Sequence, residues 1–138
     1  ELLKTQPQLK EKLWENAKKL QKGLKEKGFD IGKTDSVVTP VYMKGDIPEA
    51  TAMVMDIREN YHIFCSIVVY PVIPKGHIIY RLIPTAVHTD EDIKKTLEAF
   101  TATKEKLDAG EYKVEAVPDM ADATGKRFDY LTEKLKNK

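Results

Sequence analysis

One arginine, Arg81, is the residue of this sequence whose surroundings most suggest chemistry. It lies in "HIIYRLI" (His77 to Ile83), a run whose Ile, Tyr and Leu residues are typical of a buried strand. A guanidinium keeps its charge at any accessible pH and is costly to remove from water without a partner. The neighbouring sequence offers no obvious acidic partner. The pattern therefore leaves open which group neutralises Arg81.

Strand alternation places Arg81 on the same face as Ile79 and Ile83, with Tyr80 and Leu82 on the other face. In one interpretation Arg81 is structural, either in an ion pair or with its stem on apolar surface and its head in water. In the other it is a receptor for a carboxylate, because the guanidinium fork matches the two carboxylate oxygens. The residues alone are compatible with both.

The other reactive side chains do not form a complete active site. Cys65 lies in an apolar segment, where we expect a buried, inert thiol. The histidines His62, His77 and His88 are scattered near the ends of elements, so we expect surface or capping roles. The sequence has no Gly-rich phosphate-binding motif, no outstanding pair of carboxylates and no Cys/His cluster with metal-ligand spacing. We therefore expect neither a complete catalytic set nor a metal site.

The composition is that of an ordinary globular protein. The chain has 138 residues, of which 41% are hydrophobic and 33% charged, and this length suits one domain over 1–138. The net charge of +1 gives no overall attraction for nucleic acid or anionic lipid. The single cysteine excludes an internal disulfide and favours a reducing, cytoplasmic location, and no apolar run is long enough to cross a membrane. The chain begins at Glu1 without an initiator Met, so we expect a piece of a longer protein.

The hydrophobic pattern predicts an α+β fold with helices packed on one face of a small, mainly antiparallel sheet. The last two strands are joined by six residues, too few for a parallel crossover. The apolar character of the middle strand favours a further, missing surface against the sheet. The predicted elements are a helix over 8–27, a strand over 36–43, a helix from Asp46, strands over 62–70 and 77–83, a helix from Thr89, and beyond Gly110 a short strand and a terminal helix.

Local signals mark the ends of these elements. Asp46 and Glu49 have the spacing of a capping box, and Thr89 is the expected N-cap of the following helix. Gly28 suits the position after the first helix, and Gly76 suits a turn with positive φ in "PVIPKG". Pro40 indicates an edge strand or a bulge, because it has no N–H to donate.

The first helix has a basic face. No aromatic or second basic element reinforces this face, so we favour a solvated surface over a nucleic-acid interface. The face consists of Lys10, Lys12, Lys18, Lys19, Lys22, Lys25 and Lys27.

Four segments of the sequence form a recognisable series, which ends in a P-x-x-P-x-G turn, an arginine and an H-T-x-x-D-I motif. The segments are, in order, "LWENAKKLQKGLKEKGFDIG", "SVVTPVYMKGD", "IFCSIVVYPVIPKG" and "YRLIPTAVHTDEDI". Together they resemble the C-terminal small domain of the α-oxoamine synthases, which are pyridoxal-phosphate enzymes of the aspartate-aminotransferase fold. The similarity covers about 9–107, whereas the tail 108–138 has no match.

The resemblance implies roles for several residues. Family members join an amino acid to an acyl-CoA, with loss of CO2 or, in one branch, with the carboxylate kept. The arginine that matches Arg81 binds the α-carboxylate of the amino acid, so its acidic partner is a ligand. Pro74 and Gly76 match the turn before that strand, and His88 and Thr89 match the start of the next helix, where we infer a capping role.

The chain departs from the family pattern in three respects. The Schiff-base lysine and the other groups that hold the cofactor belong to the large domain, and no segment here resembles their surroundings. His62 stands where the family's glycine is expected, which is costlier if the position needs positive φ. Some bacterial serine-using members have a second arginine before the turn, where this chain has Val68, Val69 and Tyr70.

The sequence supports two hypotheses, the first based on the resemblance and the second on the apolar sheet. In the first, the chain is the C-terminal domain of a homodimeric, pyridoxal-phosphate-dependent acyltransferase, is inactive alone, and works with the large domain of the same parent chain. Within the family, "FCSIVVYPVIPKG" resembles bacterial serine palmitoyltransferase-type members most, followed by glycine C-acetyltransferase and 8-amino-7-oxononanoate synthase. In the second, the chain is a free-standing α+β binding module that grips a partner with its sheet.

Overall fold

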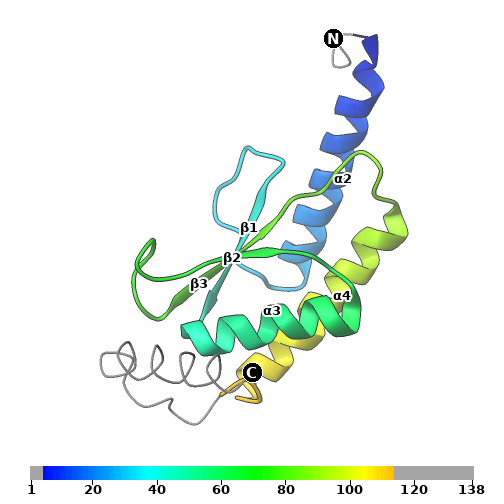
Figure 1. Ribbon diagram of the computed structural model, residues 1–138. Coiled ribbons are helices and arrows are strands. Elements are labelled where there is room, and N and C mark those ends of the chain that lie inside the picture. The colour runs from blue at the N-terminus through cyan, green and yellow to red at the C-terminus, as the bar shows by residue number, and fades with distance from the viewer. Residues whose placement is uncertain (1–4, 114–138) are drawn as a thin grey trace, which may run out of the picture.

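The computed structural model describes residues 5–113 and has the predicted α+β architecture. Within these residues three helices and three strands follow one another along the chain, and the helices lie on one side of the sheet (Figure 1). The elements are α2 (Pro7–Glu26), β1 (Thr39–Lys44), α3 (Ile47–Tyr61), β2 (Ser66–Val68), β3 (His77–Leu82) and α4 (Asp90–Asp108). The strand and helix predicted beyond Gly110 fall largely on 114–138, outside the described residues.

The three strands form an antiparallel sheet with β3 at its centre, between β1 and β2. This pairing confirms the antiparallel return between β2 and β3. Pro40 lies in the edge strand β1, as predicted. The backbone N–H of Tyr42 donates to the carbonyl of Asp30 (2.8 Å), so the N–H groups at alternate positions of β1 point away from β3. Pro40 shares this orientation, and its missing N–H therefore removes no bond to β3.

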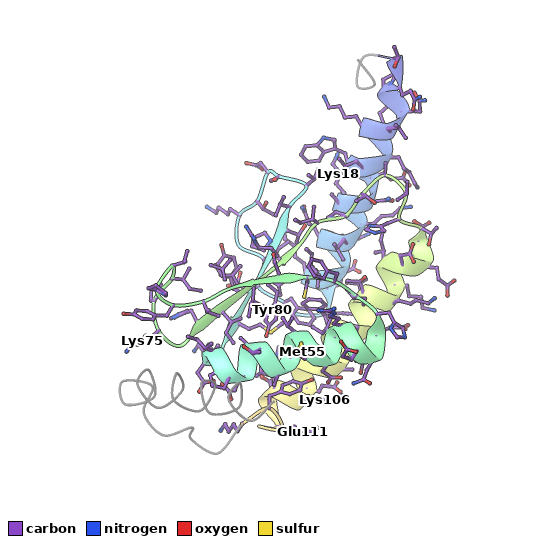
Figure 2. The ribbon with its side chains drawn as sticks, in the orientation of Figure 1. Lys18, Met55, Lys75, Tyr80, Lys106 and Glu111 are labelled. Atoms are coloured by element: carbon purple, nitrogen blue, oxygen red, sulfur yellow. The ribbon has the colours of Figure 1, made fainter. Side chains whose placement is uncertain are left out.

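The core lies between the helices and one face of the sheet, which we call the inner face. Tyr80 of β3 is fully buried there, between the sheet and the helices (Figure 2). Its ring meets that of Phe100 of α4 edge to face, with centroids 5.9 Å apart, and Phe29 packs against Phe100 in the same way at 6.2 Å. The helices complete this core with Leu20 and Leu24 of α2, Ala50, Met53 and Ile57 of α3, and Ile93 and Leu107 of α4.

The predicted helix caps are present. In α3 the backbone N–H of Glu49 donates to the Asp46 carboxylate (3.0 Å), and the Asp46 N–H donates back to the Glu49 carboxylate (2.9 Å). Thr89 and Asp92 make the same reciprocal pair at the start of α4. Gly28 follows α2 with φ of 79°, as expected for its position. Local sequence therefore determines where these helices begin and end.

Two predicted strands are shorter than expected. The segment 62–70 contains only the three-residue strand β2, because α3 extends to Tyr61 and His62 then ends it in the left-handed conformation (φ 57°). The N–H of His62 donates to the Arg58 carbonyl, and that of Ile63 donates to the Ile57 carbonyl. These two N–H groups therefore cap the C-terminal end of α3 instead of pairing with a strand. The first strand begins at Thr39 rather than at residue 36, because side-chain hydrogen bonds hold 34–38 in turns.

Candidate functional site

Arg81 lies in the central strand on the face that points away from the helices, here called the outer face. Tyr80 and Leu82 are buried on the inner face, which confirms the predicted alternation. Arg81 stands opposite Pro40 of β1 and Ser66 of β2. Its Nε donates a hydrogen bond to the Ser66 hydroxyl (3.1 Å). The guanidinium is thus held at the middle of the sheet and remains exposed.

The structure corrects the premise that Arg81 is buried. Its side chain is exposed, so the guanidinium is not stripped of water in this chain. Within residues 5–113, none of the ion pairs includes Arg81. The interpretation of Arg81 as one half of a structural ion pair is therefore not supported by residues 5–113. A stem on apolar surface with its head in water and a receptor for an incoming carboxylate both fit this geometry.

The outer face and its rim are apolar around Arg81. Ile83 follows two residues later and is 58% exposed, and Phe64, two residues before Ser66, is 84% exposed. Val87, in the connection to α4, is 82% exposed. Exposed apolar side chains gathered beside one charged group are typical of an interaction or binding surface. This arrangement agrees with the surface that the sequence predicts to be missing from the sheet.

A groove of about 850 Å³ opens beside this end of the sheet, between the end of α3 and the first half of α4. Phe64 and Ile83 line it on the sheet side, and His88 and Lys95 line it toward α4. Arg81 is not among its lining residues. Phe64 and Ile83 thus lie between the groove, which they line, and the strand position of Arg81.

The turn before β3 contains Pro74 and Gly76, and it fixes the start of the strand. The His77 N–H donates to the Pro74 carbonyl (3.3 Å), and the Gly45 N–H donates to the Gly76 carbonyl (3.2 Å). Gly76 has φ of 81°, so the predicted positive φ is confirmed. The turn therefore connects the arginine strand to the segment that begins α3.

The connection after β3 contains His88 and Thr89. Thr89 caps α4, whereas the His88 ring accepts a hydrogen bond from the Thr85 N–H through Nδ1 (3.1 Å). His88 thus stabilises the turn just before the cap. Pro74, Gly76, His88 and Thr89 lie in the connections on either side of β3, and none of them is among the hydrogen-bond partners of Arg81.

Sequence reasoning missed Asn16, a fully buried residue of α2. Its side-chain amide donates to the carbonyls of Thr85 (2.9 Å) and His88 (2.8 Å), which ties α2 to the connection after β3. Lys19 supports this tie through Asp90, with 2.7 Å between Nζ and the carboxylate. The signal was available, because Asn16 lies at helical spacing with the apolar residues Leu13 and Leu20 of the same helix.

The described residues do not fit a pyridoxal-phosphate site. Every described lysine is at least partly exposed, so none offers an amine enclosed in a cavity. Lys95 lines the groove but pairs with Glu91 at 3.8 Å, and Lys75 lies over the Tyr70 ring at 5.1 Å. No chemistry of the cofactor is therefore assigned to these residues.

The single cysteine offers no reactive thiol. Cys65 is buried, and this burial raises the pKa of its thiol to about 11, so the thiolate is scarce near neutral pH. No group of three or more metal-ligating side chains occurs in the part of the chain that the structure describes. In that same part, no helix is long and apolar enough to span a membrane.

Curated proteins with similar sequences are acyltransferases and synthases. The chain is 61% identical over 113 residues to a cysteate-C-fatty acyltransferase from Capnocytophaga ochracea, which covers 82% of this chain and 27% of that protein. It is 38% identical over 99 residues to an 8-amino-7-oxononanoate synthase from Thermoanaerobacter pseudethanolicus, covering 72% and 25%. The chain thus spans about a quarter of the length of these relatives. No protein-family model matches it.

Solved structures with a similar fold are serine palmitoyltransferases. One, solved with PLP, has a TM-score of 0.70 and 27% identity, covering 78% of this chain and 27% of that one. The enzyme from S. paucimobilis, solved with a PLP–myriocin aldimine, has a TM-score of 0.66 and 27% identity over the same shares. Both share the fold of the described domain.

Proposed function

This chain belongs to the α-oxoamine synthase family and matches the C-terminal part of its members. From this premise we propose that it is the small domain of a pyridoxal-phosphate-dependent enzyme, which acylates an amino acid from an acyl-CoA. The 61% identity to a cysteate-C-fatty acyltransferase supports this function. It favours cysteate as the amino acid and a fatty acyl group as the second substrate. The 8-amino-7-oxononanoate synthases are less similar, at 30–40% identity.

The observation that carries the proposal is the exposed guanidinium of Arg81 on an apolar face. By the family resemblance it matches the arginine that binds the substrate carboxylate, and it has no acidic partner among residues 5–113. Arg81 receives the α-carboxylate of the amino acid and so fixes the orientation of its Cα. Phe64 and Ile83 lie beside it and exclude water when the rest of the parent protein covers this face.

The cofactor and its lysine belong, in this proposal, to the part of the parent protein outside this chain. When bound, pyridoxal phosphate supplies the electron sink that stabilises negative charge at Cα. The residues described here contribute the carboxylate receptor and one wall of the site. The parent is a cytoplasmic homodimer, and the isolated chain does not catalyse the condensation.

The test uses the full-length parent protein with Arg81→Lys, which keeps the charge but loses the planar fork. We expect KM for the amino acid to rise roughly 10- to 100-fold, because hydrogen bonds between charged groups are the strong ones. KM for the acyl-CoA and the melting temperature should change little. The matched control is Arg58→Lys, an exposed arginine of α3. An unchanged KM for the amino acid would reject the receptor role, and unfolding would support a structural one.

A free-standing binding module is the second candidate, because the exposed apolar outer face also suits a protein partner. The length of the parent reading frame separates the two. About 250 further residues upstream, the size of a second and larger domain, favour the enzyme. A start codon directly before Glu1 favours the module. The relatives support the enzyme, since each is about four times as long as the matched region.

A further inference from the structure

We infer that Ser66 is a positioning residue that orients the Arg81 guanidinium toward the substrate, an inference that rests on the proposed carboxylate-binding role of Arg81. The two residues are register partners across β2 and β3 and share the outer face. The Arg81 Nε donates to the Ser66 hydroxyl oxygen at 3.1 Å. Ser66 therefore contacts the guanidinium directly and reaches the substrate only through it.

The hydroxyl is the polar anchor of Arg81 within residues 5–113. Three neighbouring positions on this face are apolar: Pro40 opposite in β1, Ile79 two residues earlier in β3, and Val68 two residues after Ser66. These three side chains cannot accept a hydrogen bond from a guanidinium. Tyr42 lies diagonally across from Arg81 on the same face, but its hydroxyl is not a hydrogen-bond partner of Arg81 among the described residues. An exposed arginine without an anchor samples many rotamers, and binding a ligand would have to immobilise it. The bond to Ser66 removes part of that cost before the substrate arrives.

The bond also fixes the direction from which a carboxylate can approach. A guanidinium carries five N–H donors, one on Nε and two on each Nη. Ser66 takes the Nε donor, so the side of the fork formed by Nε and one Nη is no longer free. The two Nη groups remain, and together they match a carboxylate approaching end-on. The geometry therefore assigns an end-on carboxylate to Arg81.

The role of Ser66 depends on its hydroxyl as the acceptor for the Arg81 Nε. Threonine preserves this acceptor and suits a strand, whereas alanine removes it.

The experiment is a double-mutant cycle in the full-length holoenzyme, with Ser66→Ala, Arg81→Lys and the combined variant. We expect Ser66→Ala to raise KM for the amino acid roughly two- to tenfold, the size of one hydrogen bond. The kcat and KM for the acyl-CoA should stay within about twofold. Ser66→Thr should restore the wild-type KM. In the Arg81→Lys background, Ser66→Ala should have no further effect, because the Nε donor is already gone.

The matched control is Val68→Ala, which truncates an apolar side chain on the same strand and face, opposite Ile79 rather than Arg81. A Ser66→Ala effect equal to that of the control, or one that persists in full in the Arg81→Lys background, would assign Ser66 a merely structural role and overturn the inference. If Arg81→Lys raises KM while Ser66→Ala does not, only the positioning role fails. If neither variant changes KM, the receptor role of Arg81 fails as well.

Discussion

The two faces of the sheet carry similar apolar side chains but differ in what covers them. On the inner face Ile78 and Tyr80 are fully buried by helices of this chain. On the outer face and its rim, Phe64 and Ile83 are mostly open to water, and no described helix covers them. The residue types alone do not distinguish the faces, so the difference lies in the partner. The inner face stabilises the domain, and we interpret the outer face as the surface that binds the substrate and the rest of the parent protein.

The largest expected effect on stability comes from a substitution in the core that covers the inner face. Phe100→Ala removes the ring that packs edge to face on both Tyr80 and Phe29. We expect the free energy of unfolding of the chain to fall by about 3–5 kcal/mol, as for other buried aromatic residues replaced by alanine. Urea denaturation followed by circular dichroism measures it. A loss below about 1 kcal/mol would mean that this cluster is not the centre of the core.

An intermediate effect concerns the helix layer beneath the inner face. Asp56 of α3 is 10% exposed and accepts hydrogen bonds from Lys106 of α4 (2.7 Å), Asn60 (2.6 Å) and Tyr112; Figure 2 labels Lys106 beside α3. Burial raises the pKa of Asp56, but these bonds together outweigh it and hold the pKa below its usual value. The stabilisation is therefore complete above about pH 5 and is lost as the pH falls through the lowered pKa.

We expect Asp56→Asn to reduce the free energy of unfolding by about 1–3 kcal/mol at pH 7, the range for a bond to a charged group. As the pH is lowered from 7 toward 2, the difference from the wild type should shrink, because the wild-type carboxylate becomes protonated as the pH falls through its lowered pKa. Denaturation at both pH values measures it. Asp35→Asn, at an exposed loop position, is the control and should show little effect at either pH. An Asp56→Asn cost that is the same at pH 2 would show that charge is not involved.

The smallest expected effect sharpens the contrast between the faces. Phe64→Ser should change the free energy of unfolding of this chain by less than about 0.5 kcal/mol, as at other surface positions. The same substitution at the buried Phe29 should cost several times more, since it removes a core side chain. In the full-length parent, Phe64→Ser should lower the melting temperature if the outer face is covered there. Equal melting temperatures of parent and variant would contradict that interpretation.

The sequence predicted best the features that depend on neighbouring residues. The capping pairs Asp46–Glu49 and Thr89–Asp92 join residues three apart, so their spacing alone specifies them. The strand predicted over 62–70 was too long, because an apolar run does not show that a helix ends at His62 or that only three residues pair with β3. Arg81 was expected to be buried for a related reason. Its apolar neighbours on the outer face imply a covering surface, and that surface is not among the described residues.

The contacts that position the site were beyond local patterns. Ser66 and Arg81 are 15 residues apart, and they meet only because of the register between β2 and β3. A register cannot be read from a three-residue strand whose boundaries are themselves unpredicted. The burial of Asn16 was easier to predict from the sequence, since a polar residue among the apolar positions of a helix needs a buried hydrogen-bond partner. Its partners, Thr85 and His88, could not be named without the fold.

The two hydrogen bonds donated by the Asn16 side chain affect the order in which the domain can fold. Its two acceptors lie 69 and 72 residues further along the chain. Contacts of such long sequence separation form slowly, because a large loop must close first. During synthesis the first helix leaves the ribosome well before Thr85 and His88, and until they appear its amide has no place to dock. Helix α2 can therefore be anchored only after β3 and the connection that follows it have been made, and a nascent chain halted before residue 88 would leave α2 without both of these hydrogen bonds.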